Sequence, residues 1–245
     1  MVDRIRTFHV AGNLDWGIPE ALENYYEWAK APADKADVIV FAGGADIQPS
    51  IYGERALHTT SCSPQRDRVE VAEYEAAVKA GKPTLGICRG AQLIHALNGG
   101  KLWQHVNNHN RGPHKTLDLA TGNIFTTTSC HHQMMQVNDE DIDDNSKPYR
   151  VVGIACESTE RHEHGLTLSI PEPGKFRNDI EVLWYPEVGA LCYQGHPEYG
   201  VRTCINYYTI LLHRFHLITT ADLQKTLSKI WPRQDASALA ARQTA

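Results

Sequence analysis

The chain has 245 residues, of which 42% are hydrophobic and 22% charged, a composition typical of one compact globular domain. It carries 24 Lys and Arg residues against 29 Asp and Glu residues, so no basic excess is available to neutralise nucleic-acid phosphates. No apolar run is long enough to cross a bilayer, and no signal-peptide stretch is visible. Six cysteines without a CxxC pair argue against a disulfide scaffold or a structural zinc site. We therefore expect a cytoplasmic protein that binds neither nucleic acid nor membrane.

The first hundred residues alternate between short apolar runs and segments with helical spacing of their apolar residues. This order predicts an α/β fold whose central sheet is mostly parallel. The expected strands are 5–10, 37–41 and 84–87, and the expected helices are 20–30, 66–80 and 91–97.

The second half is less regular until an amphipathic helix, expected over 201–215, and a last short helix over 222–230. An exposed polar loop or a fraying helix is expected over 138–147. We assign residues 1–232 to one domain and residues 233–245 to a frayed tail. The remaining expected strands are 116–119, 124–128, 149–156, 181–185 and 190–194.

Residues 86–90 read Gly-Ile-Cys-Arg-Gly, the cysteine form of a nucleophile elbow. The segment follows a buried strand and opens a helix, which is the context that such an elbow requires. The residues two before and two after the nucleophile must be small, because the turn is strained. Cys88 then lies at a helix N-terminus, which favours a thiolate and lowers its pKa, and the backbone N–H of Arg89 is placed for an oxyanion.

A cysteine nucleophile needs a base and a group that orients the base. The segment 195–198 reads Gly-His-Pro-Glu and follows the expected strand 190–194. Residues two apart point to the same face of a strand. If the strand continues, Glu198 can hold the imidazole of His196 while His196 serves Cys88.

These motifs together resemble the class I glutamine amidotransferase family. Within it, the chain is most similar to the γ-glutamyl-γ-aminobutyrate hydrolase group, also called peptidase C26. The segments that carry this closer resemblance are Gly-Gly-Ala-Asp-Ile-Gln-Pro at 43–49, Tyr-Gly-Glu at 52–54, Arg66-Asp67, Asn-Gly-Gly-Lys-Leu-Trp-Gln at 98–104 and Ser-Cys-His-His-Gln at 129–133. Two departures are Ala45, where many relatives have a third glycine, and Cys130, where an aromatic residue is common. The loop 172–178 looks inserted, and residues 162–165 do not clearly match the family signal.

The resemblance implies a flavodoxin-like three-layer α/β/α sandwich and hydrolysis of a γ-glutamyl amide through a thioester on Cys88. No metal and no cofactor are implied, and the expected partner is a small γ-glutamyl substrate. The residues carried over from the family are Cys88, His196 and Glu198 for catalysis, Gly43, Gly44 and Arg89 for the oxyanion hole, and Gln92, His131 and Gln133 for substrate binding.

Thirteen histidines invite a metal hypothesis, and His105, His109 and His114 have suggestive spacing. We expect them instead to be loop and solvent-facing residues. Of the adjacent pair, we expect His131 to lie near the substrate and His132 to make structural hydrogen bonds, although a structural role for both remains open. We expect the remaining five cysteines to be unreactive core or loop thiols, namely Cys62, Cys130, Cys156, Cys192 and Cys204.

Several functions are compatible with these residues. The first is a stand-alone γ-glutamyl amide hydrolase, and the second is a glutaminase subunit that passes ammonia to a separate synthase. A non-catalytic binding relative is a third, and a DJ-1-like protease or chaperone is a fourth, disfavoured by the His-Pro-Glu segment. The sequence leaves open the amine leaving group and whether the chain forms a homodimer or binds a synthase partner.

Overall fold

The computed structural model describes residues 6–13, 17–107, 109–110, 112–157, 161–163, 166–168 and 179–232. The expected tail, residues 233–245, and the loop 172–178 lie outside this part of the chain. The helices are α1 (Ile18–Tyr26), α2 (Pro64–Lys79), α3 (Arg89–Leu97), α4 (Arg202–Arg214) and α5 (Thr220–Ile230). The strands are β1 (Thr7–Val10), β2 (Ala29–Lys30), β3 (Val38–Phe41), β4 (Thr84–Ile87), β5 (Lys101–Trp103), β6 (His105–Val106), β7 (His114–Asp118), β8 (Ile124–Thr127), β9 (Met134–Gln136), β10 (Arg150–Ala155), β11 (Arg161–Glu163), β12 (Leu166–Leu168), β13 (Ile180–Tyr185) and β14 (Ala190–Tyr193).

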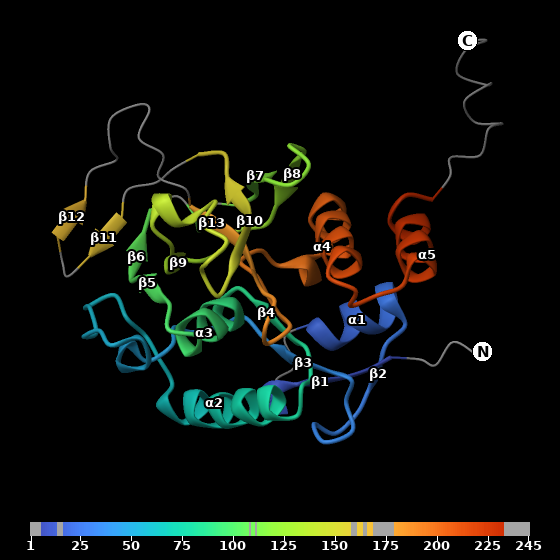
Figure 1. Ribbon diagram of the computed structural model, residues 1–245, viewed down its shortest axis with the longest axis horizontal. Helices are drawn as coiled ribbons and strands as arrows, with labels where there is room; N and C mark the ends of the chain where they lie inside the picture. The colour runs from blue at the N-terminus through green and yellow to red at the C-terminus, as the bar shows by residue number, and fades with distance from the viewer. Residues whose placement is uncertain are drawn as a thin grey trace, which may run out of the picture.

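One large sheet runs through the molecule in the order β2-β1-β3-β4-β14-β13-β10-β7-β8 (Figure 1). Strands β2, β1, β3, β4 and β14 pair in parallel, whereas the strands from β14 to β8 pair antiparallel. The sheet therefore has a parallel half, whose strands alternate with helices along the chain, and an antiparallel half that extends it. Strands β3, β4 and β14 are neighbours, so the segments after their carboxyl ends meet at one edge of the sheet.

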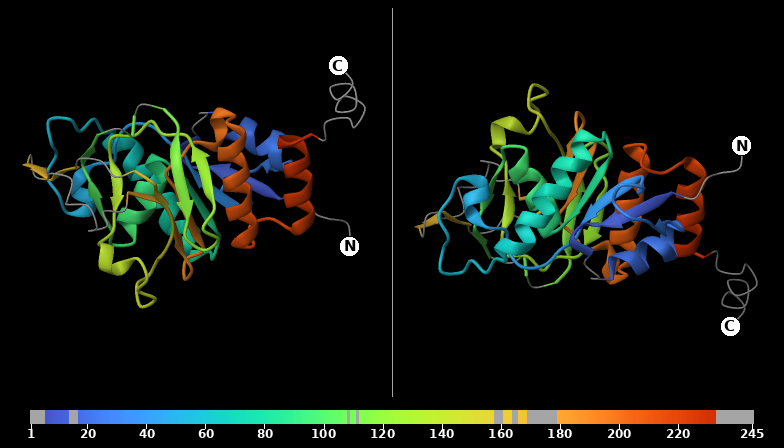
Figure 2. Two further views of the ribbon diagram at one scale, coloured as in Figure 1. Left: turned by 90° about the horizontal axis from the view of Figure 1, so that it is seen from above. Right: turned by 90° about the horizontal axis from the view of Figure 1, so that it is seen from below.

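Both faces of the parallel half are covered. Successive residues of each strand point to opposite faces and pack into opposite layers. In β3, Val38 and Val40 pack on one side, and Ile39 and Phe41 pack on the other. Helices α1, α4 and α5 cover the first side, and α2 and α3 cover the second (Figure 2). This arrangement is the three-layer α/β/α sandwich expected from the sequence.

The expected elements of the parallel half are present, with one error at α1. A helix was expected over 20–30, but α1 ends at Tyr26, and residues 29–30 form strand β2 instead. Glu27 has a left-handed backbone (φ 56°, ψ 31°) that stops the helix, and the main chain then turns to pair with β1. The two small sheets, β12-β11-β6 and β5-β9, were not predicted, since strands of two or three residues carry too little periodicity.

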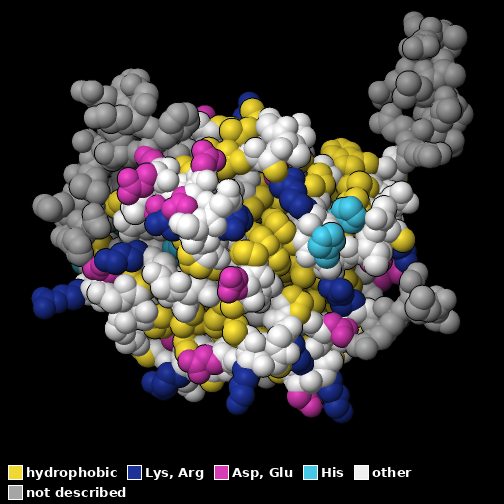
Figure 3. All heavy atoms as spheres, in the orientation of Figure 1, with side chains coloured by type: hydrophobic (Ala, Val, Ile, Leu, Met, Phe, Trp, Pro, Cys, Tyr) yellow, Lys and Arg dark blue, Asp and Glu magenta, His cyan; other side chains and the backbone are white. Residues whose placement is uncertain are grey.

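The surface shown in Figure 3 mixes basic and acidic side chains around exposed apolar ones. On this face, the charges of the described residues do not gather into a patch of one sign. Among the helices of the described residues, none combines the length and the apolar character that a membrane span requires.

Candidate active site

Cys88 stands in the tight turn between β4 and α3. Its backbone has φ 51° and ψ −108°, a strained conformation for a residue with a side chain. A Cβ atom on Gly86 would lie 2.6 Å from the backbone of Ala91, and one on Gly90 would lie 2.0 Å from the carbonyl oxygen of Phe41. Both glycines are therefore required for the close approach of α3 to the sheet, as the elbow motif predicts.

His196 and Glu198 are held together after the end of β14. The Nδ1 atom of His196 lies 2.6 Å from Oε1 of Glu198, and both side chains are almost completely buried. The predicted reason was wrong: β14 ends at Tyr193, and Glu198 reaches the ring through a single 3₁₀ turn, Pro197–Tyr199. Thr128 fixes the histidine backbone, because its Oγ1 accepts from the His196 N–H at 2.7 Å and donates to its carbonyl at 3.0 Å.

Cys130 lies between the nucleophile and the base. Its Sγ atom is 3.1 Å from Nε2 of His196, and its thiol also interacts with that of Cys88. Cys130 lies in a loop, as expected, but the loop places its thiol beside His196. The hydroxyl of Tyr199 is 3.5 Å from the same sulfur, and the ring of Tyr199 stacks on His196 at 4.4 Å.

Charge within this group is set by the hydrogen bonds between its members. Burial disfavours the imidazolium of His196, but the bonds to Cys130 and Glu198 outweigh burial and raise its pKa to about 9. The bonds from Cys88 and His196 lower the pKa of Cys130 far below its ordinary value. In turn, the bond to Cys130 and then burial raise the pKa of Cys88, against the lowering effect of the Arg89 N–H. These interactions favour a thiolate on Cys130, whereas the elbow alone favours one on Cys88.

The loop after β3 brings Gly43 against the same group. A Cβ atom on Gly43 would lie 2.8 Å from Cε1 of His196 and 3.6 Å from the Cβ of Cys88. Gly44 follows with φ 129°, a conformation that L side chains rarely adopt. Backbone N–H groups can therefore approach the nucleophile from this side, opposite the first turn of α3.

A buried ionic network fixes this loop, and the sequence analysis missed it. The guanidinium of Arg66 donates to the carbonyl oxygens of Ala42 and Gly43, at 3.0 and 2.9 Å, and to Oε1 of Glu70 at 2.8 Å. The fully buried side chain of Arg89 donates to Glu70 and Asp67. The network ties α2, the loop and the elbow into one unit. In the sequence, the only sign of this network is the spacing of four residues between Arg66 and Glu70, which by itself predicts an ion pair on the surface of a helix.

The three expected substrate-binding residues all lie in buried positions beside the elbow. Gln92 donates from Nε2 to the carbonyl oxygen of Gln133 at 2.7 Å and lies 3.4 Å from Oε1 of Gln194. The Nδ1 atom of His131 lies 2.9 Å from the same carbonyl oxygen of Gln133, and its Nε2 atom has no hydrogen-bond partner among the described residues. Burial lowers the pKa of His131, so its ring is neutral. His132 points elsewhere, with Nε2 at 3.0 Å from Oδ1 of Asp46.

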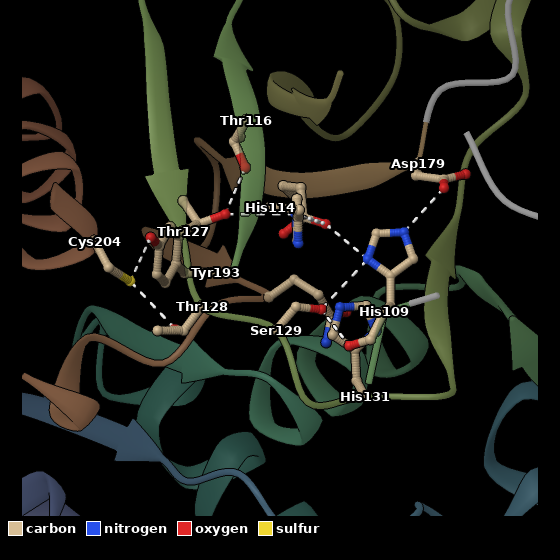
Figure 4. A network of polar contacts seen from close by, with 12 residues as sticks. His109, His114, Thr116, Thr127, Thr128, Ser129, His131, Asp179, Tyr193 and Cys204 are labelled. Carbon is tan, nitrogen blue, oxygen red and sulfur yellow. Dashed lines mark hydrogen bonds and ion pairs between the residues drawn. The ribbon is translucent and has the colours of Figure 1, made fainter. Parts of the chain in front are cut away.

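A cluster of histidines and carboxylates lies behind His131 (Figure 4). The Nε2 atom of His109 is 2.9 Å from Oδ2 of Asp179, and the Nε2 atom of His114 is 2.9 Å from Oε1 of Glu181. His109 is buried and stacks on His131 at 4.7 Å, so the expectation that it faces solvent is wrong. The ligand atoms of His109, His114 and Glu181 lie within 4.8 Å of one another, close enough for a divalent cation, although the ion pairs already match each imidazole with a carboxylate.

Comparisons with known proteins identify the family of the chain. A family model described as peptidase C26 matches residues 10–157, which include the elbow and the oxyanion-loop candidates. The chain belongs to the peptidase C26 family.

Relatives of this peptidase C26 chain are named mainly as glutamine amidotransferases. The glutamine amidotransferase-like protein YvdE of Lactococcus lactis subsp. lactis is 49% identical over 73 residues, 29% of this chain and 30% of that protein. The carbamoyl phosphate synthase small chain of Polynucleobacter asymbioticus is 25% identical over 128 residues, 52% of this chain and 26% of that protein. The alignments with the first curated relatives span only 30% to 42% of those proteins.

A solved structure supports the fold of this family member over nearly its whole length. The crystal structure of a glutamine amidotransferase from Thermotoga maritima covers 92% of this chain and 93% of its own, with a TM-score of 0.55 and 14% identity. The family model ends at residue 157, so it does not include His196 and Glu198.

Proposed function

We propose that the chain is a cysteine hydrolase that cleaves γ-glutamyl amides through a γ-glutamyl thioester on Cys88. The observation that carries this proposal is the strained turn that presents Cys88 at the N-terminus of α3, beside the buried pair of His196 and Glu198. A carboxylate that accepts from Nδ1 leaves Nε2 of His196 as the nitrogen for proton transfer, which suits a set of nucleophile, base and orienting group.

The first half of the reaction forms the thioester. The proton of Cys88 moves along its hydrogen bond to the Cys130 thiolate, which leaves the charge on Cys88. The Cys88 thiolate attacks the γ-carbonyl carbon, and the backbone N–H of Arg89 and the loop of Gly43 and Gly44 stabilise the oxyanion. As the C–N bond breaks, the His196 imidazolium donates its proton to the departing amine.

The second half releases glutamate. Neutral His196 accepts a proton from water, which attacks the thioester carbon, and the C–S bond breaks to give glutamate and the Cys88 thiolate. Cys88 then recovers its proton from Cys130. The Nε2 atom that serves the amine and the water contacts Cys130 at rest, so we expect the Cys130 side chain to rotate away when substrate enters.

The substrate class follows from the polar groups that line the buried side of the elbow. Gln92, Gln133 and the neutral ring of His131 provide amide and imidazole groups suited to the α-amino and α-carboxylate groups of a glutamyl unit. None of these three side chains carries a fixed charge. Recognition there would depend on directed hydrogen bonds, whereas the amine half points toward the exposed side, at Cys130 and Tyr199.

The direct test mixes the full chain briefly with a panel of γ-glutamyl amides, including glutamine and γ-glutamyl-γ-aminobutyrate, and measures intact mass and free amine. We expect a glutamyl adduct on Cys88 and amine release. Replacement Cys88→Ala should lower turnover by about a thousandfold or more, because the nucleophile is lost. The matched control Cys156→Ser removes an exposed cysteine at the end of β10 and should keep the wild-type rate. Retained turnover in the Cys88→Ala variant would refute the assignment.

A second candidate function is a glutaminase subunit that supplies ammonia to a separate synthase. Its support is the similarity to a carbamoyl phosphate synthase small chain. The two candidates differ in substrate and in need for a partner: the hydrolase acts alone on γ-glutamyl amines. Activity on glutamine only, and only with an added synthase chain, would favour the second. No adduct and no amine from any substrate would favour a non-catalytic relative.

A further inference from the structure

The proposed reaction needs one thiol, but the site contains two. Cys88 is buried in the elbow, whereas Cys130 comes from the segment between β8 and β9 and is exposed. Both cysteines lie beside the imidazole of His196, and their thiols interact with each other. Cys130 therefore combines access to solvent with contact to the nucleophile, a combination that a buried structural thiol does not have.

Three donors converge on the sulfur of Cys130. Nε2 of His196 lies 3.1 Å away, the hydroxyl of Tyr199 lies 3.5 Å away, and the thiol of Cys88 completes the set. Hydrogen bonds from these donors stabilise a thiolate, with the imidazolium as its counter-ion. Peroxides oxidise the thiolate rather than the thiol, so an accessible thiolate beside a second cysteine is the arrangement expected of a redox-sensitive pair.

We propose that Cys130 is an oxidative modification site at which a hydroperoxide converts the pair of thiols into a Cys88–Cys130 disulfide. In the first step, the Cys130 thiolate attacks one peroxide oxygen and the O–O bond breaks, giving Cys130 sulfenic acid and hydroxide from hydrogen peroxide. In the second step, the sulfur of Cys88 displaces the sulfenic hydroxyl, which leaves as water with the Cys88 proton.

In the disulfide, the sulfur of Cys88 is bonded to that of Cys130 and cannot attack a substrate, so the proposed reaction stops. The loss of activity rests on the proposed function, but formation of the bond does not. A disulfide brings its two sulfur atoms to about 2 Å, and the segment between β8 and β9 that carries Cys130 can make this approach while β4 and α3 stay in place. Thiol–disulfide exchange with a small dithiol restores both cysteines. The pair would thus protect Cys88 from irreversible oxidation to sulfinic acid while the protein is inactive.

The test treats the reduced full chain with hydrogen peroxide near neutral pH, blocks free thiols by alkylation, and maps peptides without reduction. We expect a cross-linked peptide containing Cys88 and Cys130, an intact mass lower by two hydrogen atoms, and recovery with dithiothreitol. The variant Cys130→Ser should give no cross-link and should accumulate sulfinic acid on Cys88. Each variant is compared with its own untreated sample, and thermal unfolding checks that it is folded.

The control Cys156→Ser keeps both active-site thiols and loses another exposed one, so it should cross-link as the wild type does. Oxidation of wild type without a Cys88–Cys130 peptide would overturn the proposal. So would reversible inactivation of Cys130→Ser equal to that of wild type. A cross-link in a chain that hydrolyses no γ-glutamyl amide would refute the proposed function alone, since the peptide map does not depend on turnover.

Discussion

At the scale of single residues, the notable feature is where the negative charge lies. A lone cysteine at the N-terminus of α3 would be favoured as a thiolate by the helix and by the Arg89 N–H. In this chain, Cys130 takes the hydrogen bond from His196 and, as an anion, raises the pKa of Cys88. These interactions therefore favour the protonated form of Cys88.

Replacing Cys130 by alanine should make Cys88 more acidic. The hydrogen bond and the negative charge that raise the pKa of Cys88 would both be gone, while the effect of the Arg89 N–H would remain. We expect the pH profile for alkylation of Cys88 by iodoacetamide, followed by peptide mass spectrometry, to move to lower pH. A profile unchanged from wild type would show that Cys130 does not control the charge of Cys88.

At the scale of elements, the site depends on the close approach of the β3 loop to the elbow and to the His196 turn. Arg66, from the first turn of α2, holds the carbonyl oxygens of Ala42 and Gly43 and so turns the loop's N–H groups toward the site. Because Gly43 has no side chain, the imidazole of His196 can lie directly against this loop. The loop is thus shaped by a helix on one side and by an imidazole on the other.

The variant Gly43→Ala should lose much more activity than stability. Its Cβ would lie 2.8 Å from Cε1 of His196, so the buried ring must shift and turnover falls by about a hundredfold. The contrasting variant Gly189→Ala, whose Cβ meets nothing closer than 3.7 Å, should lose about 1 kcal/mol because φ is 62°, yet keep its turnover. Urea unfolding and steady-state rates of both variants check this. Equal loss of activity in the two would contradict it.

The sequence predicted those parts of the site that are governed by local rules. The elbow needs Gly86 and Gly90 at fixed positions, and the structure contains the close contacts that require them. Cys130 could not be placed, because the irregular segment 128–133 has no periodicity, and its path is set by the bonds of Thr128 to the distant His196. The buried position of His109 likewise depends on Asp179, 70 residues away. The catalytic and binding roles of the candidate residues stay predictions.

At the scale of the whole molecule, the antiparallel half of the sheet is joined to the helix layer through Asp118. This buried carboxylate at the end of β7 accepts two hydrogen bonds from Arg214 of α4, at 2.8 and 3.1 Å, and one from Tyr207 at 3.0 Å. Burial raises its pKa, but the bonds from Arg214 and Thr121 outweigh burial and lower the pKa overall. Strands β7 and β8, which lead to the Thr128 segment, are thereby fixed to α4.

The variant Asp118→Asn should destabilise the protein by about 3 kcal/mol at pH 7, because Arg214 loses its buried partner. The folded-state pKa lies below the unfolded value, so the contribution of the carboxylate is present above about pH 4 and is lost as the pH falls further. The acid-induced loss of stability should therefore be smaller in the variant. Urea unfolding from pH 7 down to pH 3 measures both effects. The control Asp143→Asn, at an exposed position, should match wild type.

The distances along the chain between residues that meet at the site have a kinetic consequence. Cys130 and His196 are 66 residues apart, Thr128 and His196 are 68 apart, and Gln92 and Gln194 are 102 apart. Closing loops of this length costs entropy that is recovered only when β4 and β14 pair. During refolding, helical signal should therefore return before activity does. In the partly folded chain, Cys88 would lack the surroundings that keep it protonated. Its thiol is therefore most exposed to chemical damage in the interval before β4 and β14 pair.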